Sequence, residues 1–295
     1  MDIKNKILLI TSLLFILLGS LFIIQAQSIG KLRLVFCDVG QGDGMLLISP
    51  GGNQVVVDGG PGRKMVDCLS SKMPFWDRKI ELMVSTHAQK DHMEGLIEVL
   101  GRYEVGTIVT TGVENDTEVY RAWEEAVKKE GARIYTPVAG DKLMADKLEM
   151  MVLWPSFAKA SEGKPSIEEW RVNPPKDLNE SSIVAKLEYG GFCAYLTGDI
   201  PKEILQLLID TECELLKVSH HGSKTGTNKE IVDLVNPAVA VIQVGKNSFG
   251  HPTKEVLNIL ESKGVKILRN DINGIIEVES DGKSFRVKVD SQSEK

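Results

Sequence analysis

The sequence has few aromatic residues, little histidine and no excess of positive charge. Aromatic residues make up 6% of its 295 residues, and 35 Lys and Arg stand against 41 Asp and Glu, for a net charge of −6. A protein that coats nucleic acid through its overall charge is therefore excluded, and any polyanion must be held by a local site. With 42% hydrophobic residues, the chain is not disordered, collagen-like or a coiled coil.

Cysteine is also scarce, and it shows no CxxC pairing. The four cysteines are Cys37, Cys68, Cys193 and Cys213. In a chain of this length, such a pattern predicts ordinary buried or free thiols rather than a disulfide framework.

One long apolar run stands at the N-terminus. Residues 7–24 contain no charged side chain and follow Lys4 and Lys6. We predict a signal peptide or membrane anchor over residues 1–28, because the run lies between a signal-peptide core and a full bilayer span in length. The run fits a cleaved signal peptide and an uncleaved anchor equally well. In both cases the rest of the chain is exported, so the predicted location is extracytoplasmic.

The exported part alternates short apolar runs with helical patterns. Ten runs are typical of strands, at 32–37, 45–48, 54–58, 81–86, 107–111, 150–154, 182–189, 192–197, 215–219 and 239–244. Amphipathic patterns at 92–103, 118–131, 201–210, 228–236 and 252–264 predict helices between several of them. We therefore expect one α/β domain over 31–289 with mixed sheets covered by helices on their outer faces, a surface loop at 155–180 and a polar tail at 290–295.

All five histidines stand at junctions between a predicted strand and a predicted helix. They are His87, His92, His220, His221 and His251. Asp91 lies beside the first two, and Asp199 follows another strand. Ligand sites in layered α/β proteins gather at strand ends, and imidazole with carboxylate suits a divalent metal, so we predict a metal site. Asp91 also fits a helix N-cap, with Glu94 completing a capping box.

Neighbouring residues on a strand face opposite sides of the sheet. At most one of His220 and His221 is therefore expected to face the site, unless the strand has ended before them.

Two glycine-rich turns carry further carboxylates. The segment DVGQGDG runs into a strand rather than a helix, and DGGPGRK lacks the Lys-Ser/Thr ending of a phosphate-binding loop. We interpret both as tight turns near the metal site. Asp43 and Asp58 are thus predicted to support the site or to face the substrate.

These motifs together resemble the metallo-β-lactamase superfamily, and specifically the hydrolase domain of ComEC-type DNA-uptake proteins. The similar segments are DVGQGD, VVVDGG, THAQKDH, LNESSIVAKLEYGG, LTGD, KVSHHGSKT and GKNSFGHP. The resemblance implies an αββα sandwich with two mixed sheets and a phosphodiesterase-type nuclease activity. It implies one or two divalent ions, with Zn²⁺ or Mn²⁺ favoured, on metal ligands His87, Asp91, His92, Asp199 and His251.

The sequence departs from the superfamily pattern at two places. Gln89 replaces the middle histidine of H-x-H-x-D-H, and Asn179 and Ser182 occupy the region that usually supplies another histidine. These departures deplete the first metal site, so one tightly held ion and one weaker ion are expected. Asn179 and Ser182 become predicted support residues.

The predicted function is hydrolysis of a phosphodiester, with DNA as substrate and a link to DNA uptake. Asp91 would act as ligand or orient the attacking water, and His220 or His221, with His221 preferred, would donate the proton to the leaving oxygen. Lys217, Lys224 and Lys246 could supply local positive charge, although solubility is the favoured explanation for each of them.

Two other functions fit the same residues. One is a metallo-hydrolase of a small ester, lactone or β-lactam, and the other is a membrane-tethered binding module whose metal centre has decayed. The membrane is an expected partner if residues 7–24 stay uncleaved. No protein partner is predicted.

Overall fold

The computed structural model describes residues 2–7, 9–15, 30–155, 169–170 and 173–290. Residues 3–7 and 9–15 are helical, and the rest of the apolar 7–24 run lies outside the described residues. No helix in the described ranges is long and apolar enough to cross a bilayer. Most of the predicted surface loop and residues 291–295 of the predicted tail also lie outside them.

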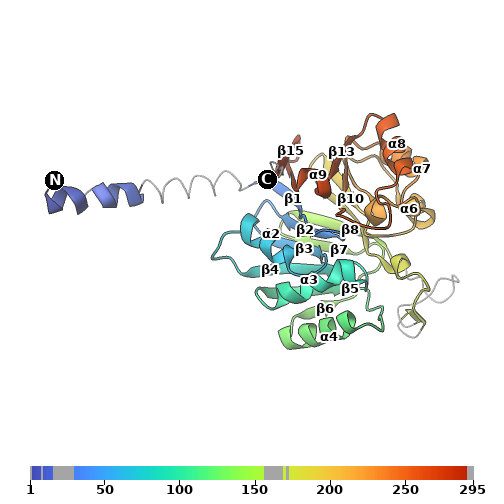
Figure 1. Ribbon diagram of the computed structural model, residues 1–295, viewed down its shortest axis with the longest axis horizontal. Helices are drawn as coiled ribbons and strands as arrows, with labels where there is room; N and C mark the ends of the chain where they lie inside the picture. The colour runs from blue at the N-terminus through green and yellow to red at the C-terminus, as the bar shows by residue number, and fades with distance from the viewer. Residues whose placement is uncertain (1, 8, 16–29, 156–168, 171–172, 291–295) are drawn as a thin grey trace.

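Two mixed sheets form the centre of the fold (Figure 1). The first has the strand order β15-β14-β1-β2-β3-β4-β5-β6, and the second has the order β13-β12-β11-β10-β9-β8-β7. The strands of the first are β1 (Leu32–Phe36), β2 (Gly44–Ile48), β3 (Gln54–Gly59), β4 (Lys79–Ser85), β5 (Glu104–Thr110), β6 (Arg133–Tyr135), β14 (Ile275–Ser280) and β15 (Phe285–Asp290). Those of the second are β7 (Lys142–Ala145), β8 (Leu148–Trp154), β9 (Val184–Tyr189), β10 (Phe192–Leu196), β11 (Leu215–Lys217), β12 (Val239–Ile242) and β13 (Lys266–Arg269).

Helices cover the outer faces of both sheets. Those along the first sheet are α2 (Lys64–Lys72), α3 (Lys90–Leu100) and α4 (Glu118–Glu130), and those along the second are α6 (Lys202–Leu208), α7 (Lys229–Val235) and α8 (Lys254–Ser262) (Figure 1). Shorter elements are α9 (Asn270–Asn273) and the 3₁₀ turns η1 (Leu178–Ser181) and η2 (Ser219–Gly222). One apolar cluster fills the space between the sheets, and two more lie beneath the helices. The predicted sandwich of two mixed sheets flanked by helices is confirmed.

Each of the ten predicted apolar runs contains a strand, but five strands have no counterpart in the prediction. These strands are β6, β7, β13, β14 and β15. They lie at or near the sheet edges. Four of them are only partly buried, and β14, although largely buried, contains Glu277 and Glu279, so the apolar pattern is weak in all five.

The start of α3 differs from the prediction. Gln89 is the N-cap, and Asp91 lies inside the first turn without capping it. Glu94 does not form a capping box either, because its carboxylate accepts a hydrogen bond from Gly62 N at 2.9 Å. The carboxylate of Asp91 is therefore free to face the site.

The cysteine prediction is wrong, because all four cysteines form disulfides. Cys37 bonds to Cys68 of α2 over a Cα separation of 5.9 Å, and Cys193 of β10 bonds to Cys213 over 5.0 Å. Both pairs are distant in sequence, separated by 31 and 20 residues, and are brought together only by the fold. No local spacing could have revealed either pair.

Candidate metal centre

The predicted site residues follow the carboxyl ends of parallel strands in both sheets. Asp58 lies in β3 and His87 follows β4, whereas Asp199 follows β10 and His221 follows β11. Because β3 and β4 are parallel, as are β10 and β11, the strand ends lie side by side within each sheet, and the 3.3 Å approach of His92 Nε2 to Asp199 Oδ2 shows that the two sets of ends meet. The site therefore lies where the two sheets open toward each other.

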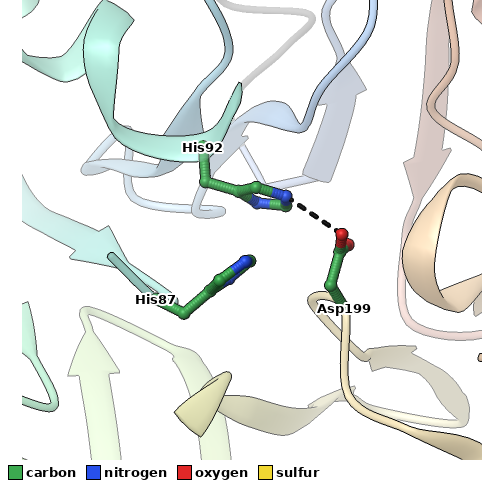
Figure 2. Close-up of side chains that lie close together, drawn as sticks. All are labelled: His87, His92 and Asp199. Atoms are coloured by element: carbon green, nitrogen blue, oxygen red, sulfur yellow. Dashed lines mark ion pairs between the residues drawn. The ribbon is translucent and has the colours of Figure 1, made fainter. Parts of the chain in front are cut away.

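Polar partners orient the imidazoles of His87 and His92. His92 Nδ1 lies 2.9 Å from Asp58 Oδ2, which also accepts a 2.7 Å bond from the Thr86 hydroxyl. His87 Nδ1 lies 3.1 Å from that hydroxyl. With Nδ1 donating in each ring, the lone pair of Nε2 is left for the site, as in carboxylate–histidine–metal arrangements. Figure 2 shows both rings converging with Asp199.

His220 and His221 both reach the site because the strand has ended before them. β11 stops at Lys217, and both histidines sit in η2 with positive φ values of 51° and 54°. His221 Nδ1 donates to Gln243 O at 2.8 Å, which leaves its Nε2 for the site. His220 lies nearer the opening, with Nε2 3.9 Å from Asp199 Oδ2.

Asp199 is the residue on which these rings converge. Asp199 Oδ2 lies 3.3 Å from both His92 Nε2 and His221 Nε2, and His221 Nε2 lies 3.4 Å from Asp91 Oδ2. Ligand atoms around a tetrahedral Zn²⁺ are separated by about 3.3 Å, given metal–ligand bonds of about 2.0–2.1 Å. The spacing thus fits a divalent ion.

The nitrogens that face this point lack other partners. Nε2 of His87, His92 and His221 is buried in each case and forms no hydrogen bond within the described part of the chain. Buried polar atoms are normally satisfied, so three orphaned nitrogens directed to one place indicate that a ligand completes them. Four overlapping groups of ligand atoms occur here: His87, His92 and Asp199; Asp91, His92 and His221; Asp43, Asp58 and His92; and Asp43, Asp199 and His221.

A buried lysine lies beneath the same carboxylates. Lys217 is 1% exposed, and its ammonium contacts Asp43, lies 3.7 Å from Asp199 Oδ1 and donates to Gly198 O at 2.8 Å. Burial disfavours the charged form, but the carboxylates of Asp43 and Asp199 outweigh it and raise the pKa of Lys217. Lys217 is therefore a fixed internal cation and cannot contact a polyanion.

The other predicted residues take different places. Ser182 is buried, and its hydroxyl accepts a bond from Asp199 N at 3.1 Å. Asn179 is buried in η1, whereas Lys224 is exposed beyond η2. His251 packs against His220, with ring centroids 5.5 Å apart, but it belongs to none of the four ligand groups. Its role as a metal ligand stays a prediction.

Carboxylates control the charge of the buried imidazoles. Burial opposes protonation of His221, but Asp199, Asp43 and Asp91 outweigh it and raise its pKa to about 10. Asp199 and Asp58 likewise raise the pKa of His92 well above its ordinary range against burial. His87 behaves differently, because burial and the nearby His92 lower its pKa to about 3.

These shifts predict a pH-dependent stability of the metal-free protein. Because the pKa of His221 rises from about 6.5 in the unfolded chain to about 10 in the fold, its imidazolium stabilises the fold fully below about pH 6.5. That contribution is lost as the pH rises toward 10. We expect the Tm of chelator-treated protein to fall between about pH 7 and about pH 10.

The metal-loaded protein is the control in this experiment. Its ligand histidines are already deprotonated, so its Tm should fall less over the same range. The Tm of the metal-free protein could stay level over this range, or it could fall in parallel with the Tm of the metal-loaded protein. Either result would contradict the conclusion that His221 is charged in the metal-free fold.

Two contributors to the site have no clear signal in the sequence. Gln243 holds His221 through its backbone carbonyl, and its side chain donates to Gly44 O in the other sheet at 2.8 Å. Thr86 links Asp58 to His87. Every residue has a backbone carbonyl, so the sequence gives no sign that Gln243 contacts His221. Thr86 stands out in the sequence only as part of the THAQKDH motif.

Known proteins similar to this chain were found by both sequence and structure. No family model matches the chain. The chain is 30% identical over 263 residues to ComE operon protein 3 of Bacillus subtilis (strain 168). The aligned region covers 81% of this chain and 32% of that protein. The chain is also 26% identical over 206 residues to the competence protein ComA of Neisseria gonorrhoeae, covering 68% and 25%. The chain thus spans about a third or less of these relatives.

Among solved structures, YhfI from Bacillus subtilis, a metallo-β-lactamase fold protein, matches with a TM-score of 0.54 at 11% identity over 83% of this chain and 99% of YhfI. This chain has the metallo-β-lactamase fold. CmlA from Streptomyces venezuelae, a diiron β-hydroxylase, matches with a TM-score of 0.52 at 13% identity, covering 88% of this chain and 54% of CmlA. The motif resemblance is therefore confirmed, and the chain combines the metallo-β-lactamase fold with similarity to competence proteins and a candidate metal centre.

Proposed function

We propose that this protein is a metal-dependent hydrolase of phosphodiester bonds, with DNA as its substrate. The observation that carries the proposal is the convergence of three buried Nε2 atoms that form no hydrogen bond within the described residues, from His87, His92 and His221, on the carboxylate of Asp199. Similarity to competence proteins supports DNA over other phosphodiesters. The proposed centre holds one or two divalent ions, Zn²⁺ or Mn²⁺.

Residues of this chain would bind the ion and orient the attacking water. His87, His92, Asp199 and neighbouring ligands would hold a divalent ion, which when bound would lower the pKa of a water molecule and polarise a phosphoryl oxygen. Asp91, whose side chain is 34% exposed, would accept a hydrogen bond from the attacking water. Burial raises the pKa of Asp91, but the nearby His221 and His92 outweigh it and keep that carboxyl ionised.

Exposure favours His220 over His221 as the proton donor to the leaving oxygen. His221 is 2% exposed and held by Gln243 O, whereas His220 is 27% exposed and opens onto solvent. A proton donor must come within hydrogen-bond reach of the leaving group. The exposed ring of His220 would be accessible to a leaving group that enters from solvent, whereas the ring of His221 would not.

Metal analysis and a cleavage assay on the full chain test the proposal. We expect at least about one equivalent of bound divalent metal and cleavage of single- or double-stranded DNA with Mn²⁺ or Zn²⁺. Asp91→Asn should lower the cleavage rate by about 10²-fold or more. Asp67→Asn, an exposed carboxylate on α2, is the matched control and should leave the rate unchanged. Full activity in Asp91→Asn would refute the mechanism.

We further propose that the domain acts outside the cytoplasm. Two disulfides support this location, since disulfides persist in oxidising compartments and are rare in the cytosol. The uncharged 7–24 run behind Lys4 and Lys6 points the same way.

Thiol trapping in the producing cells tests the location. We expect that the protein, alkylated under denaturing conditions without reductant, carries no label on Cys37, Cys68, Cys193 or Cys213, and that reduction exposes all four. The same chain without residues 1–28, retained in the cytoplasm, is the control and should be labelled directly. Four labelled thiols in the unreduced full-length protein would contradict an extracytoplasmic location.

A further inference from the structure

A short loop at the mouth of the metal centre is held in one conformation by a single side chain. Asn247 Nδ2 donates to Gly245 O at 2.9 Å and to His251 O at 2.8 Å. Asn247 Oδ1 accepts from Phe249 N and His251 N, both at 3.1 Å. These four bonds use the full capacity of the amide, so the loop between β12 and α8 is braced from within.

This braced loop presents an aromatic ring to solvent. Phe249 is 71% exposed, although large apolar side chains are usually buried. Its ring lies 6.0 Å from that of His251, with the planes inclined by 31°, and His251 lies 5.5 Å from His220. Because His220 approaches Asp199, the rings form a row from the candidate metal centre to the surface, with Phe249 at its outer end.

Exposed lysines lie on two loops next to the site, the one that carries Phe249 and the one that follows His220. Lys246 stands three residues before Phe249 and is exposed, and Lys224 is exposed on the loop that follows η2. Aromatic rings combined with basic side chains are the usual means by which proteins hold single-stranded nucleic acid, since bases stack on the rings and phosphates contact the cations. The acidic remainder of the chain makes such a local arrangement necessary.

We infer that Phe249 is a stacking platform for an unpaired nucleobase next to the phosphodiester at the metal centre. The inference rests on the proposed function and specifies its substrate as single-stranded nucleic acid. In a duplex the base faces are covered by their neighbours, so the ring reaches them only after unstacking. Because the loop is already ordered by Asn247, little conformational entropy is lost when the base binds.

A binding experiment separates this inference from cleavage. Fluorescence anisotropy in chelator would measure the affinity of the full chain for a labelled single-stranded oligothymidine and for the same backbone without bases. We expect the wild-type chain to prefer the base-bearing strand by on the order of 10-fold. Phe249→Leu, which keeps an apolar side chain but loses the ring face, should remove this preference, and Phe249→Trp should restore it.

The control variant is Phe75→Leu, another exposed phenylalanine, which lies before the start of β4 and therefore at the opposite end of that strand from His87. It should keep the full preference for the base-bearing strand.

Two results would overturn the inference. One is a preference that survives in Phe249→Leu, and the other is a wild-type chain that binds both strands equally or binds neither. If the preference depends on Phe249 but no metal supports DNA cleavage, the proposed function fails while the stacking role stands. Cleavage without a base preference would instead refute the stacking role and leave the proposed function standing.

Discussion

Replacing Lys217 with methionine is expected to destabilise the metal-free protein by about 3–5 kcal/mol, one of the largest effects of any single substitution in this chain. Methionine has a similar length, so packing changes little. The loss comes from Asp43 and Asp199, which are 2% and 1% exposed and would lose the contacting ammonium, so that only the imidazoliums of His92 and His221 would still offset their charges. Leaving one partner of a buried ion pair uncompensated costs far more than the pair itself contributes.

Urea unfolding of chelator-treated protein measures this effect. Lys79→Met is the matched control, because its ion pair with Glu81 is exposed at the lysine and should contribute little. Added Zn²⁺ should recover part of the loss in Lys217→Met, since a second cation then offsets the same carboxylates. Equal stability of the two variants would show that Lys217 does not balance the site.

Much of the fold and of the site could be predicted because their signals are local. Each of the ten predicted apolar runs holds a strand, and every histidine follows such a strand or opens the next helix. Ligand sites in layered α/β proteins gather at strand ends, so the sequence predicts that His87, Asp199 and His221 belong to one site, although β4 lies in one sheet and β10 and β11 lie in the other. The pattern of strand ends was sufficient for this step.

What could not be predicted depends on long-range packing. The pairing of Cys37 with Cys68 requires α2 to lie across the end of β1, and no sequence spacing reports that contact. Lys217 lies in a fully buried strand. A lysine in the sequence normally indicates an exposed side chain that aids solubility or contacts a polyanion. The pairing of Lys217 with Asp43 joins the two sheets, and only the folded sandwich brings them together.

Backbone conformation explains why the sequence could not show that both His220 and His221 face the site. The alternation rule allows only one of His220 and His221 to face the site on a continuing strand. Both take left-handed conformations after β11 ends, and this turn directs both rings toward Asp199. Non-glycine residues rarely adopt positive φ, so such a turn is rarely expected from sequence.

Asp199→Asn is the substitution with the largest expected effect on activity. Asparagine keeps the size of the side chain but removes the charge that lies 3.3 Å from His92 Nε2 and His221 Nε2. We expect metal content to fall below detection and phosphodiester cleavage to fall by at least about 10³-fold, or about 4 kcal/mol in transition-state stabilisation. Elemental analysis and initial rates measure the two effects. Asp67→Asn is again the control, and metal retained at the wild-type level would exclude Asp199 as a ligand.

The same substitution also tests how the buried charges depend on one another. Asp199 helps to raise the pKa of both His92 and His221, so its loss should weaken the fall in Tm between about pH 7 and about pH 10 in the metal-free protein. It also removes one of the two carboxylates that Lys217 balances. The double variant Lys217→Met with Asp199→Asn should therefore lose less stability than the sum of the single variants, because neutralising both partners leaves fewer uncompensated charges. Strict additivity would mean that Lys217 and Asp199 act independently and that Asp43 is the only carboxylate whose charge Lys217 balances.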